Sequence, residues 1–470
     1  MDTKKLRQKI LDLAIRGKLV PQDPNDEPAS VLLERIRAEK EQLIKDGKIK
    51  RAKKSAASDK SHYENMPYKI PSNWCWTTIG ELFYLQAGKF INASEITDCK
   101  DDLHSYPCYG GNGLRGYVTT YNRNGLFPII GRQGALCGNI NVAEGKFYAT
   151  EHAVVVETFA SVDVKVFVYF LIQLNLNQYA TATAQPGLAV KTINEVPIPL
   201  PPLNEQYRIS HAIEKAFNKM SIIDESKYSL CMCIQQFKAG VLDIAISGKL
   251  VPQDSSDEPA IELLKRINPD FVSCDNRHYE NVPYEVPESW QWVKLKDLCI
   301  FLSRGKSPVY SETDKRYPVF AQKCNLKGGG ISLKEARFLE PSTISKWKDV
   351  YKLQDGDILI NSTGTGTVCR TRLFKSEYLC DYPFVVPDSH VSVIRTYEQI
   401  SSEYAYLVLS SKFSQDYMMD NLAGSTNQKE LYISVLENLL FPLPPFGEQM
   451  RIVKCVNKIY TQLEQISSEL

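Results

Sequence analysis

The side chains best suited to reversible hydrogen-bonding chemistry lie in glycine-rich turns. One such turn consists of Gly131, Arg132, Gln133 and Gly134. An arginine can pair with guanine through two hydrogen bonds, a glutamine can do the same with adenine, and flanking glycines let the backbone approach a phosphate closely. The turn at the corresponding place in the second half of the chain contains Ser362, Thr363 and Thr365. Both turns are candidate contacts for bases or phosphates; turns that serve only the fold are the alternative.

Other polar and basic side chains in loops extend this candidate surface. They are Asn112, Arg115, Arg304, Lys306, Lys323, Thr426, Asn427 and Gln428. Phosphate contacts position a protein on DNA and base contacts specify the sequence, and residue type alone does not assign these side chains to one role. His152 and His390 lie at matched places before apolar runs, where a satisfied turn or core residue is the favoured interpretation.

Motifs that would carry covalent chemistry are missing from the sequence. It contains no Gly-x-Gly-x-x-Gly, no Gly-x-x-x-x-Gly-Lys-Ser/Thr, no His-Glu-x-x-His and no Asn/Asp-Pro-Pro-Tyr/Phe loop. There are 12 cysteines, but Cys231 and Cys233 are the only close pair, and they lack zinc-ligand spacing. We therefore expect a non-catalytic chain that binds no cofactor or metal itself and keeps reduced thiols.

The composition is that of an ordinary globular protein, with 43% hydrophobic residues, 24% charged residues and a net charge of +1. Any nucleic-acid surface must therefore be a local basic patch. The first residues have no apolar signal core, and no apolar run approaches the roughly 20 residues that a membrane helix needs. We expect a soluble, cytoplasmic protein without membrane contact.

Three motifs occur twice in the same order, which indicates that the chain is a duplicated half. Gly-Lys-Leu-Val-Pro-Gln occupies 17–22 and 248–253, Pro-Tyr-x-(Ile/Val)-Pro-x-x-Trp-x-Trp occupies 67–76 and 283–292, and Pro-Leu-Pro-Pro-x-x-Glu-Gln occupies 199–206 and 442–449. The spacing between motifs differs, so a framework repeats while the segments within it vary. This pattern is typical of a scaffold that presents two different binding domains, because two catalytic copies would be expected to share their chemistry.

A long helix is predicted at the centre of the chain. Apolar residues recur at alternating steps of four and three, at positions 209, 213, 216, 220, 223, 230, 234, 237, 241 and 244, with Lys227 as the polar exception. A seam of this length favours a coiled coil. Similar patterns near both termini predict that the terminal helices pair antiparallel with the central one; independent amphipathic helices are the alternative. About 36 residues would span roughly 50 Å, or about 15 base pairs of duplex.

These elements predict an α+β fold in which two mixed α/β domains are joined by a long antiparallel two-helix coiled coil with pseudo-two-fold symmetry. We assign 1–20 to an N-terminal framework helix, 21–73 to a helix plus basic linker, 74–202 to the first variable domain, 203–248 to the central helix, 249–289 to a linker, 290–445 to the second variable domain and 446–470 to the C-terminal helix. Single helices are predicted over 164–175 and 402–419 inside the variable domains.

All three motifs, present twice in order with a heptad helix between them, resemble the specificity subunit of type I restriction–modification enzymes over nearly the whole chain. The resemblance implies two target-recognition domains, each reading one half of a bipartite site in double-stranded DNA. It also implies two methyltransferase subunits and restriction (translocase) subunits docked on the repeated framework, with S-adenosylmethionine, ATP and Mg²⁺ bound by those partners. The framework residues expected to serve docking are Glu205, Gln206, Arg208, Glu448, Gln449 and Arg451.

Two other functions stay open on the residues alone. An enzyme, either a nuclease or a methylase-linked restriction protein, would need a complete cofactor or metal site. A pure interaction scaffold would lack a DNA surface, so two basic clefts would argue against it.

Overall fold

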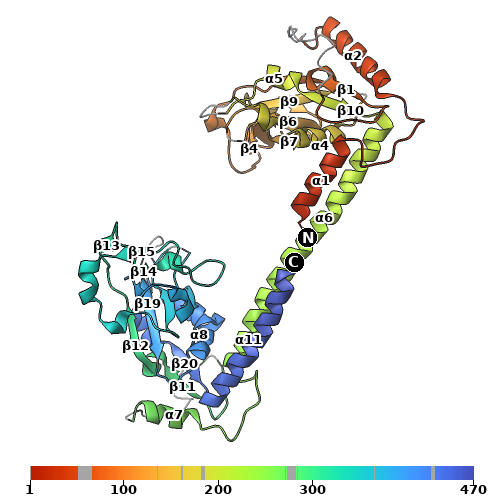
Figure 1. Cartoon of the computed structure of the whole chain (residues 1–470). Coiled ribbons are helices and arrows are strands. Elements are labelled where there is room, and N and C mark those ends of the chain that lie inside the picture. The colour runs from red at the N-terminus through yellow and green to blue at the C-terminus, as the bar shows by residue number, and fades with distance from the viewer. Residues whose placement is uncertain are drawn as a thin grey trace. The chain divides into compact units, whose positions relative to one another are not determined.

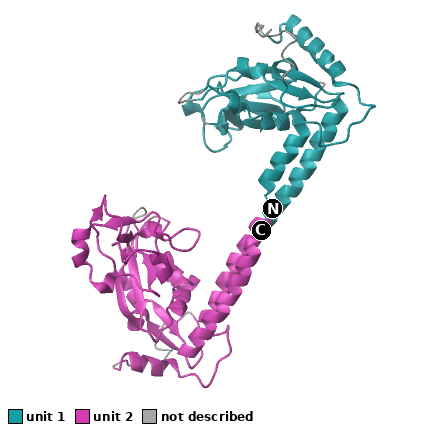
Figure 2. Cartoon of the chain, viewed as in Figure 1, with its two compact units in different colours: residues 1–226 teal, residues 227–470 magenta. Residues whose placement is uncertain are grey.

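The computed structural model describes residues 2–50, 66–134, 136–159, 162–181, 186–269, 271, 282, 284–364, 366–424 and 429–469. Most of the basic stretch of the first linker, and the candidate residues Thr365, Thr426, Asn427 and Gln428, lie outside these ranges. The chain forms two compact units, Met1–Ser226 and Lys227–Leu470 (Figure 2). The boundary between them lies inside the long helix α6 (Leu203–Ile246), so each unit contains one part of that helix.

Unit 1 is built around a four-stranded antiparallel sheet. Its strand order is β2 (Phe83–Ala87), β9 (Ala153–Thr158), β6 (Phe127–Gly131) and β7 (Ile140–Ala143). Helix α4 (Val164–Leu174) packs its buried Phe167 and Phe170 into the same core as Val154 and Val156 of β9. The helix expected over 164–175 is thereby confirmed, since Asn175 ends it in the left-handed conformation with a φ of 47°.

A second sheet and a two-stranded ribbon complete unit 1. The second sheet has the order β4 (Gly113–Val118), β3 (Tyr106–Gly110), β8 (Lys146–Ala149) and β5 (Arg123–Asn124), and the ribbon pairs β1 (Cys75–Thr78) with β10 (Pro197–Leu200). The remaining α-helices are α1 (Thr3–Ile15), α2 (Ala29–Lys45), α3 (Ile79–Leu82) and α5 (Val190–Glu195).

Unit 2 repeats the first sheet with the same connectivity. Its order is β12 (Cys299–Arg304), β19 (Val391–Thr396), β16 (Ile358–Asn361) and β17 (Thr371–Leu373), and β11 (Gln291–Lys294) pairs with β20 (Leu440–Leu443) as β1 pairs with β10. The helices are α7 (Ala260–Ile267), α8 (Ser402–Ser410), α9 (Lys412–Asp420), α10 (Ile433–Asn438) and α11 (Phe446–Ser468). The prediction of one helix over 402–419 is wrong. Ser411 has extended backbone there, and its hydroxyl accepts from the Ser414 amide to start a second helix.

The second sheet is where the two units differ. Unit 2 has the order β13 (Tyr310–Ser311), β15 (Arg337–Leu339), β14 (Pro318–Phe320) and β18 (Val386–Pro387). The parallel pair β14–β18 corresponds to β3–β8, and β15 corresponds to β4. The fourth strand joins a different neighbour, β8 in unit 1 and β15 in unit 2. The two units therefore share the first sheet and differ in the strand pairing of the second sheet.

A terminal helix lies antiparallel to α6 within each unit (Figure 1). In unit 1, the Thr3 hydroxyl of α1 donates to the Asp224 carboxylate over 2.7 Å, and Arg7 forms an ion pair with the same carboxylate. In unit 2, the Tyr460 hydroxyl of α11 donates to the Lys238 carbonyl over 3.0 Å. The predicted pairing of both terminal helices with the central helix is confirmed within each unit.

The predicted seam along α6 is confirmed in the first part of the helix and only at some positions in the second part. Ile209, Ile213 and Met220 are buried as expected. Leu230, Phe237 and Ile244, also assigned to the seam, are 40%, 57% and 46% exposed. Ile234 and Val241 are buried as the seam predicts, and Leu242, Ala245 and Ile246, which lie outside the seam, are buried as well. A helix with 3.6 residues per turn drifts against a strict seven-residue repeat, so towards the end of α6 burial shifts from Ile244 to Ala245.

Helix α6 also corrects the expectation about apolar length. An 18-residue window within it reaches a mean hydropathy of 1.3, so the helix is long and apolar enough, by length and composition alone, to cross a membrane. The packed helix of a protein that never meets a membrane passes the same test, so one such helix is weak support for a membrane span.

Candidate nucleic-acid interface

The turn 131–134 continues β6 and is held by its backbone. The amide of Arg132 donates to the His152 carbonyl over 2.9 Å, and its carbonyl accepts from the Leu188 amide over 2.9 Å. The amide of Gly134 donates to Pro186 over 3.0 Å. Within the described part of the chain, no residue forms a hydrogen bond or ion pair with the Arg132 or Gln133 side chain. The backbone of the turn is therefore fixed, whereas the side chains of Arg132 and Gln133 remain available for hydrogen bonds to another molecule.

The structure brings the two candidate loops of unit 1 together. An open pocket of about 580 Å³ is lined by the turn residue Gln133, by Asn112 and Arg115 of the β3–β4 hairpin, and by His152. A Cβ atom at Gly131 would lie 2.0 Å from the Gly111 carbonyl oxygen, so only glycine permits this approach of the two loops. Residues that lie about 20 apart in the sequence thus form one polar surface.

The matching edge of unit 2 has the same backbone bonds and different side chains. The Ser362 amide donates to the His390 carbonyl over 2.8 Å, and the Ser362 carbonyl accepts from the Leu431 amide. The Ser362 side chain is buried and its hydroxyl bonds to Ser392, so its role as a DNA contact stays a prediction. Thr363 is half-buried, and its hydroxyl lies 3.0 Å from His390 Nδ1.

Gln322 belongs to this edge and was missed by the sequence reasoning. It lies in a short 3-10 helix directly after β14, and its amide nitrogen donates to the Thr363 hydroxyl. Its position after an apolar strand was the only available signal. Because β14 corresponds to β3, Gln322 occupies the place in unit 2 that the β3–β4 hairpin occupies in unit 1.

Three basic candidates of unit 2 have different environments. Arg304 forms an ion pair with Glu430 and donates to the Leu431 carbonyl, so its guanidinium is already partnered within unit 2, and its predicted DNA contact stays a prediction. The Lys306 ammonium lies 4.2 Å from the ring centre of Tyr351, a cation–π contact that restrains it. Lys323 is exposed.

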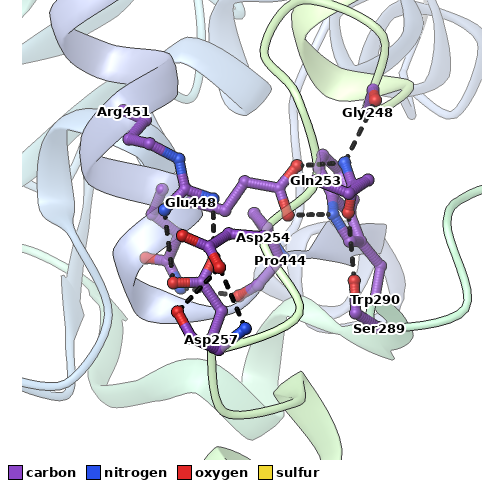
Figure 3. A network of polar contacts seen from close by, with 11 residues as sticks. Gly248, Gln253, Asp254, Asp257, Ser289, Trp290, Pro444, Glu448 and Arg451 are labelled. Atoms are coloured by element: carbon purple, nitrogen blue, oxygen red, sulfur yellow. Dashed lines mark hydrogen bonds and ion pairs between the residues drawn. The ribbon is translucent and has the colours of Figure 1, made fainter.

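Framework residues form a buried network instead of an open surface. In unit 2, Glu448 at the start of α11 accepts from the Trp290 indole over 2.8 Å and from the Gln253 amide over 2.5 Å (Figure 3). Arg451, one turn later, pairs with Asp257 over 2.6 Å. Burial raises the pKa of the Glu448 carboxyl, an effect that the two hydrogen bonds partly oppose.

Unit 1 contains the same network with nearly the same distances. Glu205 accepts from Trp74 over 2.8 Å and from Gln22 over 2.5 Å, and Arg208 pairs with Asp26 over 2.6 Å. The hydrogen bond from Arg208 lowers the pKa of Asp26.

The adjacent glutamines connect the same helix starts to the N-terminal ends of α4 and α8. Gln206 accepts from the Asp163 amide over 3.0 Å, and Gln449 accepts from the Ser401 amide over 2.9 Å. The side chains of Glu205, Gln206, Glu448 and Gln449 are almost completely buried. They offer no exposed atoms to a partner and instead fasten each variable domain to its helix pair.

Among the described residues, no group of three or more His, Cys, Asp or Glu side chains could hold a metal ion. Burial raises the pKa of the Cys108 thiol to about 11 and that of Cys369 to about 12, so neither thiol is activated as a nucleophile.

Comparison with known proteins agrees with this architecture. Residues 71–230 and 287–470 match the family described as type I restriction modification DNA specificity domain. The type I restriction enzyme EcoEI specificity subunit of Escherichia coli is 26% identical over 99% of this chain and 90% of its own length. The EcoprrI specificity subunit of the same species is 44% identical over 29% of this chain and 34% of its own length.

A solved structure titled for complex assembly and conformational transition of the type I R-M system contains a similar chain. It has a TM-score of 0.54 and 16% identity, and the match covers 86% of this chain and 94% of that one. This likeness supports the fold, and the sequence matches carry the assignment. The resemblance inferred from the repeated motifs is confirmed: the chain belongs to the family of type I restriction–modification DNA specificity subunits.

Proposed function

We propose that this chain reads a bipartite DNA site, one half-site per unit, and is itself non-catalytic. The observation that carries the proposal is the matched pair of edges at β6 and β16. The backbone bonds around Arg132 and Ser362 are equivalent, whereas the side chains presented there differ. A scaffold that keeps its backbone and changes its polar side chains is suited to reading two different sequences.

The side chains of the two edges predict different modes of reading. Arg132, Gln133, Arg115 and Asn112 of unit 1 can make paired hydrogen bonds to purine edges in the major groove. Unit 2 presents Thr363 with Gln322, which can make single hydrogen bonds or contact a thymine methyl group.

Chemistry would be supplied by partners. We infer that two methyltransferase subunits and restriction subunits dock on this chain in the cytoplasm, and that they bind S-adenosylmethionine, ATP and Mg²⁺. The duplicated framework supports two equivalent docking places, because Glu205 and Glu448 anchor the same local structure in both units. Since those side chains are buried, docking would use the surface that they shape and not the carboxylates themselves.

The proposal is tested by mapping modified adenines in the genome of cells that carry or lack the gene. Loss of the gene should remove methylation at one bipartite motif. Arg132→Ala should relax one position in one half of that motif, and Thr363→Ala should alter the other half. The Arg132 side chain makes no hydrogen bond within the described ranges, so Arg132→Ala should leave thermal stability nearly unchanged. Thr363 is half-buried and accepts from Gln322, so Thr363→Ala should cost about 1 kcal/mol. If both variants change the same half, or if deletion leaves adenine methylation unaltered, the proposal fails.

A further inference from the structure

Unit 2 contains a long loop that unit 1 lacks, at the point where the reading edge is formed. In unit 1, β3 turns directly into β4, with Gly110 paired to Gly113. In unit 2, the corresponding strands β14 and β15 are separated by residues 321–336. This segment, named here the β14–β15 loop, contains Lys323, Lys327 and Lys334 against one acidic residue, Glu335.

The loop is anchored at its base and open at its tip. Cys324 and Ile331 are buried in a core that contains residues of β14, β16 and β19, and the Ser332 amide donates to the Cys324 carbonyl over 2.9 Å. Residues 326–330 are exposed. At Gly329 and Gly330, φ is 109° and 76°, and a Cβ atom at either would meet nothing within 4 Å. The tip is therefore accessible to another molecule's backbone at close range.

Two arginines lie beneath the loop and donate hydrogen bonds to its carbonyl groups. Arg370 donates to the Asn325 carbonyl over 2.6 Å, and Arg372 donates to the Leu326 carbonyl over 2.8 Å and the Gly330 carbonyl over 3.3 Å. A carbonyl oxygen satisfies a guanidinium hydrogen without cancelling its charge. These bonds leave the positive charge of both arginines in place while fixing the loop.

The positive charges gathered here have no internal counter-ion. Within the described ranges, Lys323, Lys327, Arg370 and Arg372 form no ion pair with any carboxylate. The contrast is Arg304, which is paired with Glu430 at the same edge. Because the whole chain carries a net charge of only +1, these four cations, two on the loop and two beneath it, form a distinct local patch.

The patch adjoins the side chains proposed to read bases. Gln322, at the start of the loop, donates to the Thr363 hydroxyl, and the Asn325 amide donates to the Asn361 side-chain oxygen over 2.6 Å. Asn361 ends β16, directly before the turn with Thr363. A duplex whose bases are read at this turn would bring its backbone phosphates to the loop.

We propose that the β14–β15 loop is a phosphate clamp, in which Lys323 and Lys327 contact DNA backbone phosphates beside the half-site read by unit 2. This inference rests on the proposed DNA-reading function and deepens it. Unit 1 has only the turn Gly111–Asn112 at this place, without a charged residue. The two half-sites are therefore held unequally: unit 2 supplies sequence-independent attraction that unit 1 lacks here.

The test measures how DNA affinity depends on salt for the full chain assembled with its methyltransferase. Lys323→Ala/Lys327→Ala is compared with wild type on a duplex carrying the methylated motif and on an unrelated duplex. Each lost phosphate contact lowers the slope of log Kd against log salt by roughly 0.9, so the slope should fall by about 2. The affinity loss should be similar on both duplexes, because phosphate contacts carry no sequence information.

Two controls make the result specific. Lys265→Ala/Lys296→Ala removes the same charge from unit 2, from α7 and from the segment before β12, and should leave the slope unchanged. Lys323→Arg/Lys327→Arg keeps the charge and should retain the wild-type slope. The clamp is refuted if the alanine pair behaves like the control pair, or if affinity is lost only on the motif duplex. If the wild-type complex shows no preference for the motif duplex, the DNA-reading function itself is overturned along with the clamp.

Discussion

Replacing Glu448 by alanine should destabilise unit 2, because the buried indole N–H of Trp290 loses its carboxylate acceptor. The Glu448 carboxylate accepts from the indole nitrogen of Trp290, and both residues are 1% exposed. Its second donor, Gln253, is exposed and can turn to water once the carboxylate is gone. The alanine variant therefore removes the carboxylate that accepts from the buried indole N–H, at the junction between β11 and the start of α11.

The magnitude follows from this asymmetry. A hydrogen bond to a buried charged acceptor contributes about 1.5–3 kcal/mol, and a stranded buried donor costs a similar amount. We expect Glu448→Ala to lower the free energy of unfolding by about 2–3 kcal/mol. Glu448→Gln should cost less than about 1 kcal/mol, because the amide oxygen still accepts from the indole and the amide nitrogen can donate to Gln253.

The assay is urea denaturation of the full chain followed by tryptophan fluorescence and circular dichroism. A double-mutant cycle with Trp290→Phe isolates the Trp290–Glu448 interaction and should give a coupling of about 1.5–2 kcal/mol. Glu464→Ala on the same helix is the matched control. Its carboxylate is 69% exposed and pairs with Lys238, so its removal should cost roughly 0–0.5 kcal/mol. A coupling below about 0.5 kcal/mol, or equal losses for the alanine and glutamine variants, would refute the reasoning.

One further prediction concerns the pH dependence at Glu448, and two concern the turn after β6 and helix α6. Burial raises the pKa of Glu448 above its unfolded value, so the protonated side chain stabilises the fold at low pH, and this contribution is lost as pH rises through the folded-state pKa. The unfolding free energy of the wild type minus that of Glu448→Gln, measured against pH, should therefore fall across that pH range. A difference that does not change with pH would show that the pKa of Glu448 is ordinary. Gly131→Ala should lower the melting temperature, at a cost of about 1–3 kcal/mol, because its Cβ would lie 2.0 Å from the Gly111 carbonyl oxygen, and an unchanged melting curve would contradict the close approach. Ile234→Ala should cost about 2–4 kcal/mol in urea titrations and Phe237→Ala under about 1 kcal/mol, whereas the strict heptad seam demands comparable losses.

Much of the architecture could be predicted because short sequence motifs occur twice in the chain in the same order. The motifs at 199–206 and 442–449 place Glu205 and Glu448 at equivalent points, and the structure shows both accepting from the tryptophan of the preceding motif. The pairing of terminal helices with α6 was likewise visible in apolar periodicity. The motifs could not reveal that these glutamates are buried, because a repeated polar residue gives the same sequence pattern whether its side chain faces a partner or the protein interior.

The candidate site was predictable in place and only partly in detail. The turn after β6 and the turn after β16 were both recognised from glycine and polar residues following apolar strands. Yet Ser362 is buried, Arg304 is committed to Glu430, and Gln322 joins the edge from another strand. Each of these outcomes depends on a partner between about 30 and 130 positions away in sequence, which local patterns do not encode.

By itself, the amino-acid sequence determined the duplication, the helix–domain–helix order and the family, because these depend on residue type and spacing along the chain. Tertiary structure alone decided which stripe of α6 is buried, which polar side chains stay exposed and where uncompensated charge collects. The physical reason is that burial and ion pairing are settled by residues distant in the chain that become neighbours on folding. The loop 321–336 illustrates this: the sequence singled out Lys323 alone, and its shared patch with Lys327, Arg370 and Arg372 exists only once β17 lies beneath the loop.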